Sequence, residues 1–380
     1  MAFDFGALRR HPDVEGHGLE ASDAADRLIL DEAETRIRAA GPGELVIVDD
    51  AFGALALAAA SAGARGIRSH QDPITGERAL AENAERLGLA GAAQSMPLDA
   101  ELVAGARLVL LRLPRSLDRL DEVAGLIATH ADPDVAVVAG GRIKHMSLAM
   151  NDVLGAWFER VDVSHARQKS RVLTSTEPRA SRHPAAEPWP RSERHDDLDL
   201  TVAAHGGVFA GTGVDIGTRF LLEQLGDAVP DAASAVDLAC GTGIVAAWLA
   251  RARPALTVTA SDRSAAAAAS ARLTAEANGV ADRVHVHRAD GLEPLADASE
   301  PLVVLNPPFH SDAAVHAGIA AHLFTDAARV LAPGGELWCV WNSHLRYRPL
   351  LERLVGPTRQ VARSAKFTVT ASTKRSDETR

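Results

Sequence analysis

The sequence predicts an α/β protein in which one doubly wound, parallel-sheet fold occurs twice in tandem. Short β-branched runs alternate with longer Ala- and Leu-rich stretches, which favours parallel strands joined by helices. Similar segments return after about 190 residues, and the chain of 380 residues is twice that spacing. Because 47% of the residues are hydrophobic, the chain can bury two cores of ordinary domain size.

The repeat is clearest where a buried strand is followed by a turn. The run LVIVDDAFGA at 45–54 has the same plan as AVDLACGTGI at 235–244. Asp72 and Asp262, which follow the next strand in each copy, are also 190 residues apart. Other matching segments have slightly different offsets, which loop insertions would produce. We therefore expect two copies of one fold.

The second copy shows the alternation of elements most plainly. Its expected strands cover 235–239, 256–262, 284–289, 302–306 and 336–341, and its expected helices cover 243–251, 264–278 and 317–331. LAPGG at 331–335 predicts a turn between the last helix and the next strand. The closing runs QVARSA and FTVTAST predict an antiparallel hairpin at one edge of the sheet.

A proline-rich, basic segment separates the two copies. Residues 165–196 contain four prolines, which preclude a continuous helix, so we expect a linker there. The predicted domains are therefore 1–164 and 197–380.

Composition excludes several protein classes. No run of about 18 uncharged apolar residues is present, so we expect no membrane partner. Two cysteines, Cys240 and Cys339, cannot build a disulfide framework and fit a reducing cytoplasm. The start of the chain has no secretory pattern. We expect a cytoplasmic monomer.

The charge is unevenly distributed, which bears on a nucleic-acid partner. The whole chain carries −10, but residues 165–195 carry +4 and residues 341–380 carry +6, leaving −20 for the remainder. A segregated basic surface can hold phosphates on an acidic protein.

The turn DLACGTG at 237–243 predicts a ligand site at the carboxyl edge of the second sheet. Gly241 and Gly243 let the backbone approach a ligand at the start of a helix. Asp262 ends the next strand and can accept hydrogen bonds from ribose hydroxyls, although it could also cap the following helix. Asp290 follows the third strand and could accept from an adenine amino group, or simply form an Asp-Gly turn.

The tetrapeptide Asn306-Pro307-Pro308-Phe309 follows the buried run LVVL and indicates amine chemistry. The Asn306 side-chain oxygen and the Pro307 carbonyl can accept hydrogen bonds from a planar exocyclic NH2 group, which aims its lone pair at a methyl donor. Phe309 offers a face on which a flipped-out base can stack. Proline restricts the turn, so the acceptors are preorganised.

Together these motifs resemble class I S-adenosylmethionine-dependent methyltransferases that modify exocyclic amines. More narrowly, the chain resembles the ribosomal RNA guanine-N2 methyltransferases of the RsmC and RlmG families, which are tandem duplications with a degenerate first copy. The segments that carry this resemblance in the second copy are 207–225, 306–310, 331–351 and 366–373. The first-copy segments 49–60, 140–147 and 167–173 favour the large-subunit, 23S-type RlmG branch over the 16S-type branch.

The resemblance implies two Rossmann-like class I methyltransferase domains and a role for each motif. S-adenosylmethionine is the implied cofactor, and ribosomal RNA or a ribosomal subunit is the implied partner. The implied cofactor-binding residues are Asp237, Gly241 and Gly243 at the methionine end, Asp262 at the ribose, Asp290 at the adenine, and Asp215 and Thr218 along the pocket. Asn306, Pro307 and Phe309 would hold the target guanine.

The first copy departs from this pattern. Its turn has only Gly53 where the second copy has two glycines, and Leu113 within LRLPR at 111–115 stands at the expected place of Asn306. We therefore expect the first copy to bind no cofactor, and to position RNA or support the second copy.

Two other functions use the same motifs. NPPF-type tetrapeptides also serve N6-adenine and protein glutamine methylation, and a non-catalytic ribosome-binding protein would need no activity at all. A metal site at His310, Asp312, His316 and His322 fits no ligand spacing, so we expect no metal. Cys240 lacks a His/Asp partner pattern and reads as a small buried residue.

Overall fold

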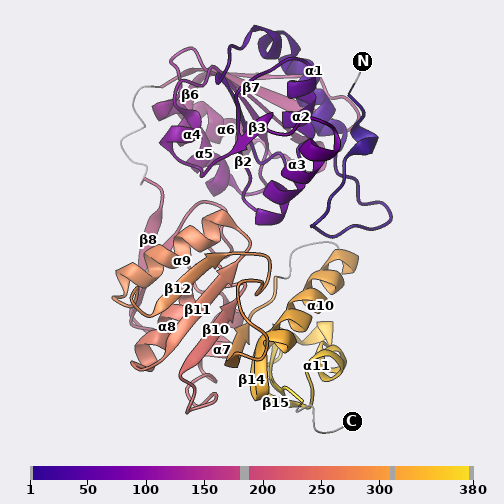
Figure 1. The fold of residues 1–380 in the computed structure, drawn as a ribbon. Coiled ribbons are helices and arrows are strands. Elements are labelled where there is room, and N and C mark those ends of the chain that lie inside the picture. The colour runs from indigo at the N-terminus through magenta and orange to yellow at the C-terminus, as the bar shows by residue number, and fades with distance from the viewer. Residues whose placement is uncertain (1–2, 180–187, 309–312, 376–380) are drawn as a thin grey trace. The chain divides into compact units, whose positions relative to one another are not determined.

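The chain folds as two compact units, Met1–Trp189 and Pro190–Arg380 (Figure 1). The computed structural model describes residues 3–179, 188–308 and 313–375. Within those residues, no helix is both long and apolar enough to cross a membrane.

The first unit is built on a seven-stranded sheet with strand order β3-β2-β1-β4-β5-β7-β6. Strands β1 to β5 are parallel, while β7 runs antiparallel to both β5 and β6. Its elements are η1 Phe5–Ala7, α1 Ala24–Ala39, β1 Leu45–Val48, α2 Ala54–Ser61, β2 Ile67–His70, α3 Ile74–Arg86, β3 Ala93–Ser95, α4 Ala100–Val103, β4 Leu108–Arg112, α5 Leu117–His130, β5 Ala136–Arg142, η2 Ile143–His145, α6 Ala149–Trp157, β6 Phe158–Val163 and β7 Ser170–Pro178.

The second unit repeats this sheet with the order β12-β11-β10-β13-β14-β16-β15. An additional hairpin, β8-β9, lies against α9, where Ala203 N donates to Thr274 Oγ1 at 3.0 Å. The elements are β8 Arg191–His195, β9 Leu200–Ala204, α7 Ile216–Leu222, β10 Ser234–Leu238, α8 Ile244–Ala252, β11 Thr257–Asp262, α9 Ala265–Ala277, β12 Val284–Arg288, β13 Glu300–Leu305, α10 Ala313–Val330, β14 Leu331–Asn342, η3 Ser343–Leu345, α11 Arg348–Leu354, β15 Thr358–Arg363 and β16 Phe367–Thr373.

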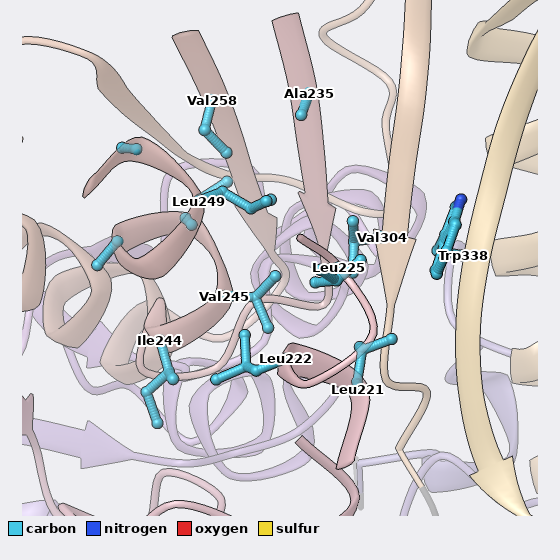
Figure 2. Close-up of a cluster of buried hydrophobic side chains, with 14 of the residues drawn as sticks. Leu221, Leu222, Leu225, Ala235, Ile244, Val245, Leu249, Val258, Val304 and Trp338 are labelled. Atoms are coloured by element: carbon cyan, nitrogen blue, oxygen red, sulfur yellow. The ribbon is translucent and has the colours of Figure 1, made fainter. Parts of the chain in front are cut away.

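Each sheet buries both faces, which explains its continuous apolar strands. On one face of the second sheet, Leu249 of α8 lies by Val258 of β11, and Trp338 of β14 joins the same buried cluster on the side where α7 contacts β14 (Figure 2). On the other face, α10 and α11 pack against alternate residues of the same strands, including Val236 and Val303. Together these helices position the carboxyl ends of the strands, where the predicted site residues lie.

The predicted repeat is present in the backbone conformation as well as in the strand order. After β10, the residues Ala239, Gly241 and Gly243 have φ of 56°, 54° and 75°. After β1, the residues 49, 51 and 53 have φ of 59°, 61° and 91°, although only the last is glycine. The first unit has therefore kept the shape of the turn while losing one of its glycines.

The expected linker over 165–196 is wrong for much of its length. Residues Ser170–Pro178 form β7, which pairs with β5 and β6, because SRVLTSTEP has the alternation and β-branched content of a strand. Residues 191–195 form β8 of the second unit.

The turn expected at 331–335 is also different in the structure. These residues lie within β14, which pairs with β13 through a shift in register between Glu300 and Leu302. The terminal hairpin, formed by β15 and β16, is confirmed. In the sheet, β16 lies between β14 and β15, so β15 is the edge strand.

Two glycines of the turn after β10 have different structural requirements, and substitution separates them. A Cβ on Gly243 would lie 2.8 Å from Ala271 Cβ and 2.9 Å from its Cα, whereas a Cβ on Gly241 would meet no heavy atom within 4 Å. We expect Gly243→Ala to cost about 2–5 kcal/mol of stability, from backbone strain and overpacking together. Gly241→Ala should cost only about 1–2 kcal/mol, from the left-handed backbone. Calorimetric unfolding measures both, and equal losses would contradict this assignment.

Candidate functional site

The predicted site residues of the second unit gather at the carboxyl edge of its sheet. Asp237 lies in β10, Asp262 ends β11, and Asn306 directly follows β13. Because β10 pairs with both β11 and β13, the ends of these three strands are adjacent. This is the edge at which open α/β sheets bind ligands.

Asp262 is held in place by the turn after β10. Its Oδ2 accepts a hydrogen bond from Gly241 N at 3.0 Å, and its Oδ1 accepts one from Ser264 N at 2.9 Å. A carboxylate has spare lone pairs beyond these two, so it can still accept from hydroxyl groups. The open space next to Gly241 lies beside this carboxylate, whereas Gly243 is enclosed by Ala271.

Asp237 lies near the end of β10, just before this turn, and is only 3% exposed. Its Oδ2 accepts a hydrogen bond from Ala246 N of α8 at 3.0 Å, so the side chain anchors the start of that helix. Burial raises the pKa of Asp237 to about 7, against the hydrogen bond from Ala246, and nearby Asp262 adds to the rise.

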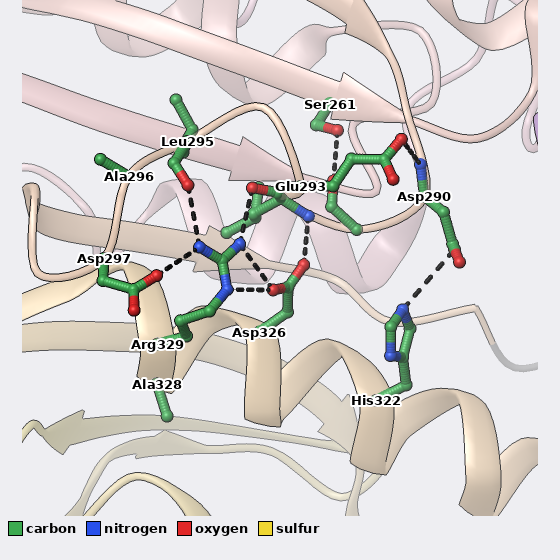
Figure 3. Close-up of polar contacts among 12 residues, drawn as sticks. Ser261, Asp290, Glu293, Leu295, Ala296, Asp297, His322, Asp326, Ala328 and Arg329 are labelled. Atoms are coloured by element: carbon green, nitrogen blue, oxygen red, sulfur yellow. Dashed lines mark hydrogen bonds and ion pairs between the residues drawn. The ribbon is translucent and has the colours of Figure 1, made fainter.

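The Asp290 loop is fixed by α10 (Figure 3). Asp326 of α10 accepts a hydrogen bond from Leu292 N, and Arg329 donates to Leu292 O and Leu295 O, both at 2.8 Å. Asp290 Oδ1 lies 3.6 Å from His322 Nε2 as an ion-pair partner, and this carboxylate is the main cause that raises the pKa of His322. His322, one of the residues of the metal site not expected from the sequence, thus pairs with Asp290 instead.

Asn306 is oriented by a partner from the preceding segment of the chain. Its Nδ2 donates to Thr218 Oγ1 at 3.0 Å. Its Oδ1 is buried and accepts no hydrogen bond from any described residue. Thr218, which we predicted along the cofactor pocket, therefore turns the Asn306 amide so that the oxygen is left for another donor.

Asp215 acts within its own helix. Its Oδ2 accepts from Gly217 N at 2.8 Å and from Thr218 N at 3.3 Å, which caps α7. Asp215 therefore positions Thr218, and Thr218 in turn positions Asn306.

Some predicted residues do not extend this picture. Pro307 is buried next to Asn306, while Phe309, His310 and Asp312 lie outside the described residues. No group of three metal-ligating side chains occurs in the part of the chain that the structure describes. Burial, followed by Asp262 and Asp237, raises the pKa of Cys240 well above its usual range, which disfavours the thiolate that a nucleophile requires.

The first unit has different side chains at the same edge. Val48 pairs with Leu111 as Leu238 pairs with Leu305, so the next residues, Arg112 and Asn306, are equivalent. The sequence had predicted Leu113 at this place. The prediction was one residue out because strand pairing, not the prolines, fixes this equivalence.

The turn of the first unit also has different side chains from the turn of the second. Asp50 occupies the place of Cys240 and is buried, with its two oxygens accepting from Leu55 N and Ala56 N of α2 at 2.7 and 2.9 Å. The buried Arg119 lies 3.5 Å from Asp49 in the same turn. This turn therefore carries two acids beside a buried cation, where the turn of the second unit has Ala239, Cys240 and Gly241.

The basic segments predicted to bind phosphates are partly neutralised by ion pairs within the protein. In 165–195, Arg167, Arg179 and Arg194 pair with carboxylates of described residues. In 341–380, Arg348 pairs with Glu352 and Arg359 with Glu336. Uneven charge along the sequence is therefore a poor guide to the charge that is free on the surface.

Comparison with known proteins places the chain in one family. A family model for an RLMG N-terminal domain matches residues 2–179, and one for a methyltransferase small domain matches residues 199–371. The chain is 36% identical to the ribosomal RNA large subunit methyltransferase G of Pseudomonas paraeruginosa, over 95% of this chain and 96% of the relative. The chain belongs to the ribosomal RNA large subunit methyltransferase G family.

One further relative and one solved structure are similar over nearly the whole chain. The large subunit methyltransferase G of Streptomyces coelicolor is 35% identical, with 97% of each chain covered. The solved structure of the T. thermophilus 16S rRNA N2 G1207 methyltransferase, RsmC, in complex with AdoMet and guanosine, has a TM-score of 0.73. It covers 93% of this chain and 92% of its own at 24% identity, so it supports the two-unit fold. The predicted family and fold are confirmed.

The raised pKa of Asp237 predicts how the stability of this family member depends on pH. The folded pKa of about 7 lies above the ordinary value of 3.8, so the folded state holds its proton where the unfolded chain has lost it. The contribution of Asp237 to the free energy of unfolding is fully present below about pH 4, and it is lost as the pH rises to about 7. We expect Asp237→Asn to flatten that fall.

Thermal unfolding at intervals between pH 4.5 and 7.5 measures the difference between variant and wild type. Asp50 has the same shift in the first unit, to about 7, so Asp50→Asn is the matched control and should flatten only the unfolding of that unit. An unchanged pH slope in Asp237→Asn would contradict the assignment.

Proposed function

We propose that the protein transfers a methyl group from S-adenosylmethionine to the exocyclic N2 of a guanine in large-subunit, 23S-type ribosomal RNA, in the cytoplasm. The observation that carries this proposal is Asn306 Oδ1, a buried acceptor that receives no hydrogen bond from a described residue. A buried unpartnered oxygen is costly unless a ligand supplies the donor. An exocyclic amino group is a donor of this kind.

The orientation of Asn306 accounts for the chemistry at the acceptor. Because Thr218 holds Nδ2, the side chain presents its oxygen, which can accept a hydrogen bond from the guanine NH2 group. That bond, together with one to the Pro307 carbonyl, would favour a pyramidal nitrogen. The lone pair of that nitrogen then points out of the plane of the base, toward the methyl donor. The aromatic ring of Phe309 would stack on the base. The proton of the methylated nitrogen can leave to water afterwards, so no strong base is required.

The residues around Gly241 fit the proposed cofactor. S-adenosylmethionine supplies the electrophilic methyl group. The Asp262 carboxylate, fixed by Gly241 N and Ser264 N, would accept from the ribose hydroxyls. Asp290 would accept from the adenine amino group while His322 holds its other side. Gly241 leaves open space for the methionine end. Asp237 would act indirectly, because it fixes the start of α8, and Gly243 is the residue at which the chain enters that helix.

Substitution of Asn306 tests the acceptor role. We expect Asn306→Ala to lower kcat for methyl transfer about 10²-fold or more, as for loss of a preorganised polar group, with little change in S-adenosylmethionine affinity. Asn306→Asp keeps an acceptor oxygen and should fall between Ala and wild type. Thr218→Val should lower kcat less than Asn306→Ala, because it only loosens the orientation. Radiolabelled methyl transfer to 23S rRNA measures all three, and wild-type turnover in Asn306→Ala would remove this residue from the mechanism.

Only the second unit is proposed to bind the cofactor. In the first unit, the charged side chains of Asp49, Asp50 and Arg119 lie at the turn where the second unit has small residues. We expect titration calorimetry to give one S-adenosylmethionine per chain, and Asp262→Ala to weaken that binding at least tenfold. A stoichiometry of two would contradict the assignment to one unit.

A further inference from the structure

The first unit carries a basic pocket at the carboxyl edge of its own sheet. The pocket has a volume of about 310 Å³ and lies beside the ends of β4 and β5 and the short helix η2. Its charged and polar side chains are Asp23, Arg112, Arg115, Arg142, Lys144 and His145. Arg112 and Arg115 come from LRLPR, and the last three come from GGRIKHMS, so two distant motifs meet here.

The positive charge of the basic pocket exceeds what its neighbours neutralise. Arg112 pairs with Asp26 and with Asp23, and Arg142 lies 4.0 Å from the same Asp23. Arg115 and Lys144 form no ion pair with any carboxylate of the described residues. Four cations thus face two carboxylates, one of which lines the pocket and one of which lies behind it.

Two further observations indicate that the basic pocket can donate hydrogen bonds to a ligand. Arg142 Nε is buried and donates no hydrogen bond to any described residue. Arg115 Nη2 lies 3.3 Å from His145 Nε2, so the neutral imidazole accepts from the guanidinium. Desolvation, followed by the positive charges of Arg115, Lys144 and Arg142, lowers the pKa of His145, which favours the neutral ring. The histidine orients Arg115 without adding or cancelling charge.

The equivalent places in the second unit make the difference in chemistry plain. Strand register puts Arg112 where Asn306 stands, and β5 ends at Arg142 as β14 ends at Asn342. Each exchange replaces an amide, which can both donate and accept, by a guanidinium, which can only donate. The pocket therefore cannot repeat the binding of an amino group and suits a group that only accepts.

We propose that the basic pocket binds a backbone phosphate of the ribosomal RNA substrate. Arginine guanidinium groups match phosphate oxygens in geometry and charge, and Lys144 adds a mobile point charge. Phosphate contacts of this kind fix the register of a nucleic acid without reading its sequence. The inference rests on the proposed function, since it takes rRNA as the substrate, and it assigns the first unit a specific role in holding that RNA.

The test removes the two unpaired charges together. In Arg115→Ala/Lys144→Ala, we expect KM for 23S rRNA to rise about tenfold, with kcat and S-adenosylmethionine affinity unchanged. Filter binding of the same RNA at several salt concentrations should show a slope of log K against log salt that is smaller by about 1–2, since each lost phosphate contact removes about 0.7–0.9. Neither residue is buried, so we expect the melting temperature to stay at the wild-type value.

The matched control is Arg38→Ala/Arg107→Ala, which removes the same charge from the first unit. Both side chains are at least half exposed, and Arg107 precedes β4 at the opposite edge of the sheet. This variant should retain the wild-type KM and salt slope. The single variant Lys144→Ala, which removes an unpaired charge alone, provides the same readout if the double variant is unstable.

The outcomes separate the pocket from the proposed function. An unchanged KM and salt slope in the double variant would overturn the pocket assignment while leaving methyl transfer intact. Competition by inorganic phosphate that depends on Arg115 and Lys144, without any change in RNA binding, would also overturn it, because the pocket would then hold a small anion. Failure of the wild-type protein to methylate 23S rRNA would refute the proposed function, whereas filter binding would still decide whether the pocket holds RNA.

Discussion

The left-handed turn between the first strand and its helix is the constraint on which the rest of each unit depends. Three positive φ angles within five residues reverse the chain so that α2 and α8 start beside the carboxyl edge of their sheets. This reversal directs backbone N–H groups at the edge, where acids can accept from them. The two units meet that requirement differently, with Asp237 below α8 and Asp50 at the start of α2.

The same turn explains how the units diverged in function without losing the fold. A glycine with no neighbour leaves open space in the second unit, and an alanine with φ of 61° holds the same backbone in the first. In the first unit, Asp49 of this turn pairs with Arg119, and the turn has no glycine at the place of Gly241. The sheet frame then allowed other chemistry at the adjacent strand ends, where Arg112 and Arg142 replace two asparagines.

A chain of short contacts links the cap of one helix to the reactive end of the second unit. Asp215 fixes the first turn of α7, Thr218 in that turn fixes the Asn306 amide, and the amide oxygen is left without a donor. None of these residues is adjacent in sequence to the next. A similar arrangement holds the Asp290 loop, because Asp326 and Arg329 of α10 bind its backbone.

The sequence by itself determined the fold class, the duplication and the residues at the carboxyl edge, because strand patterns, glycine turns and NPPF are local signals. It also favoured the large-subunit family. Only the tertiary structure decided that 170–178 is a strand, that Arg112 replaces Asn306, and that Thr218 orients Asn306. These depend on pairing between segments far apart in the chain. The location of unpaired positive charge also depends on the tertiary structure. Ion pairs neutralise arginines of the basic segments, whereas residues of 111–115 and 140–147 come together in one basic pocket.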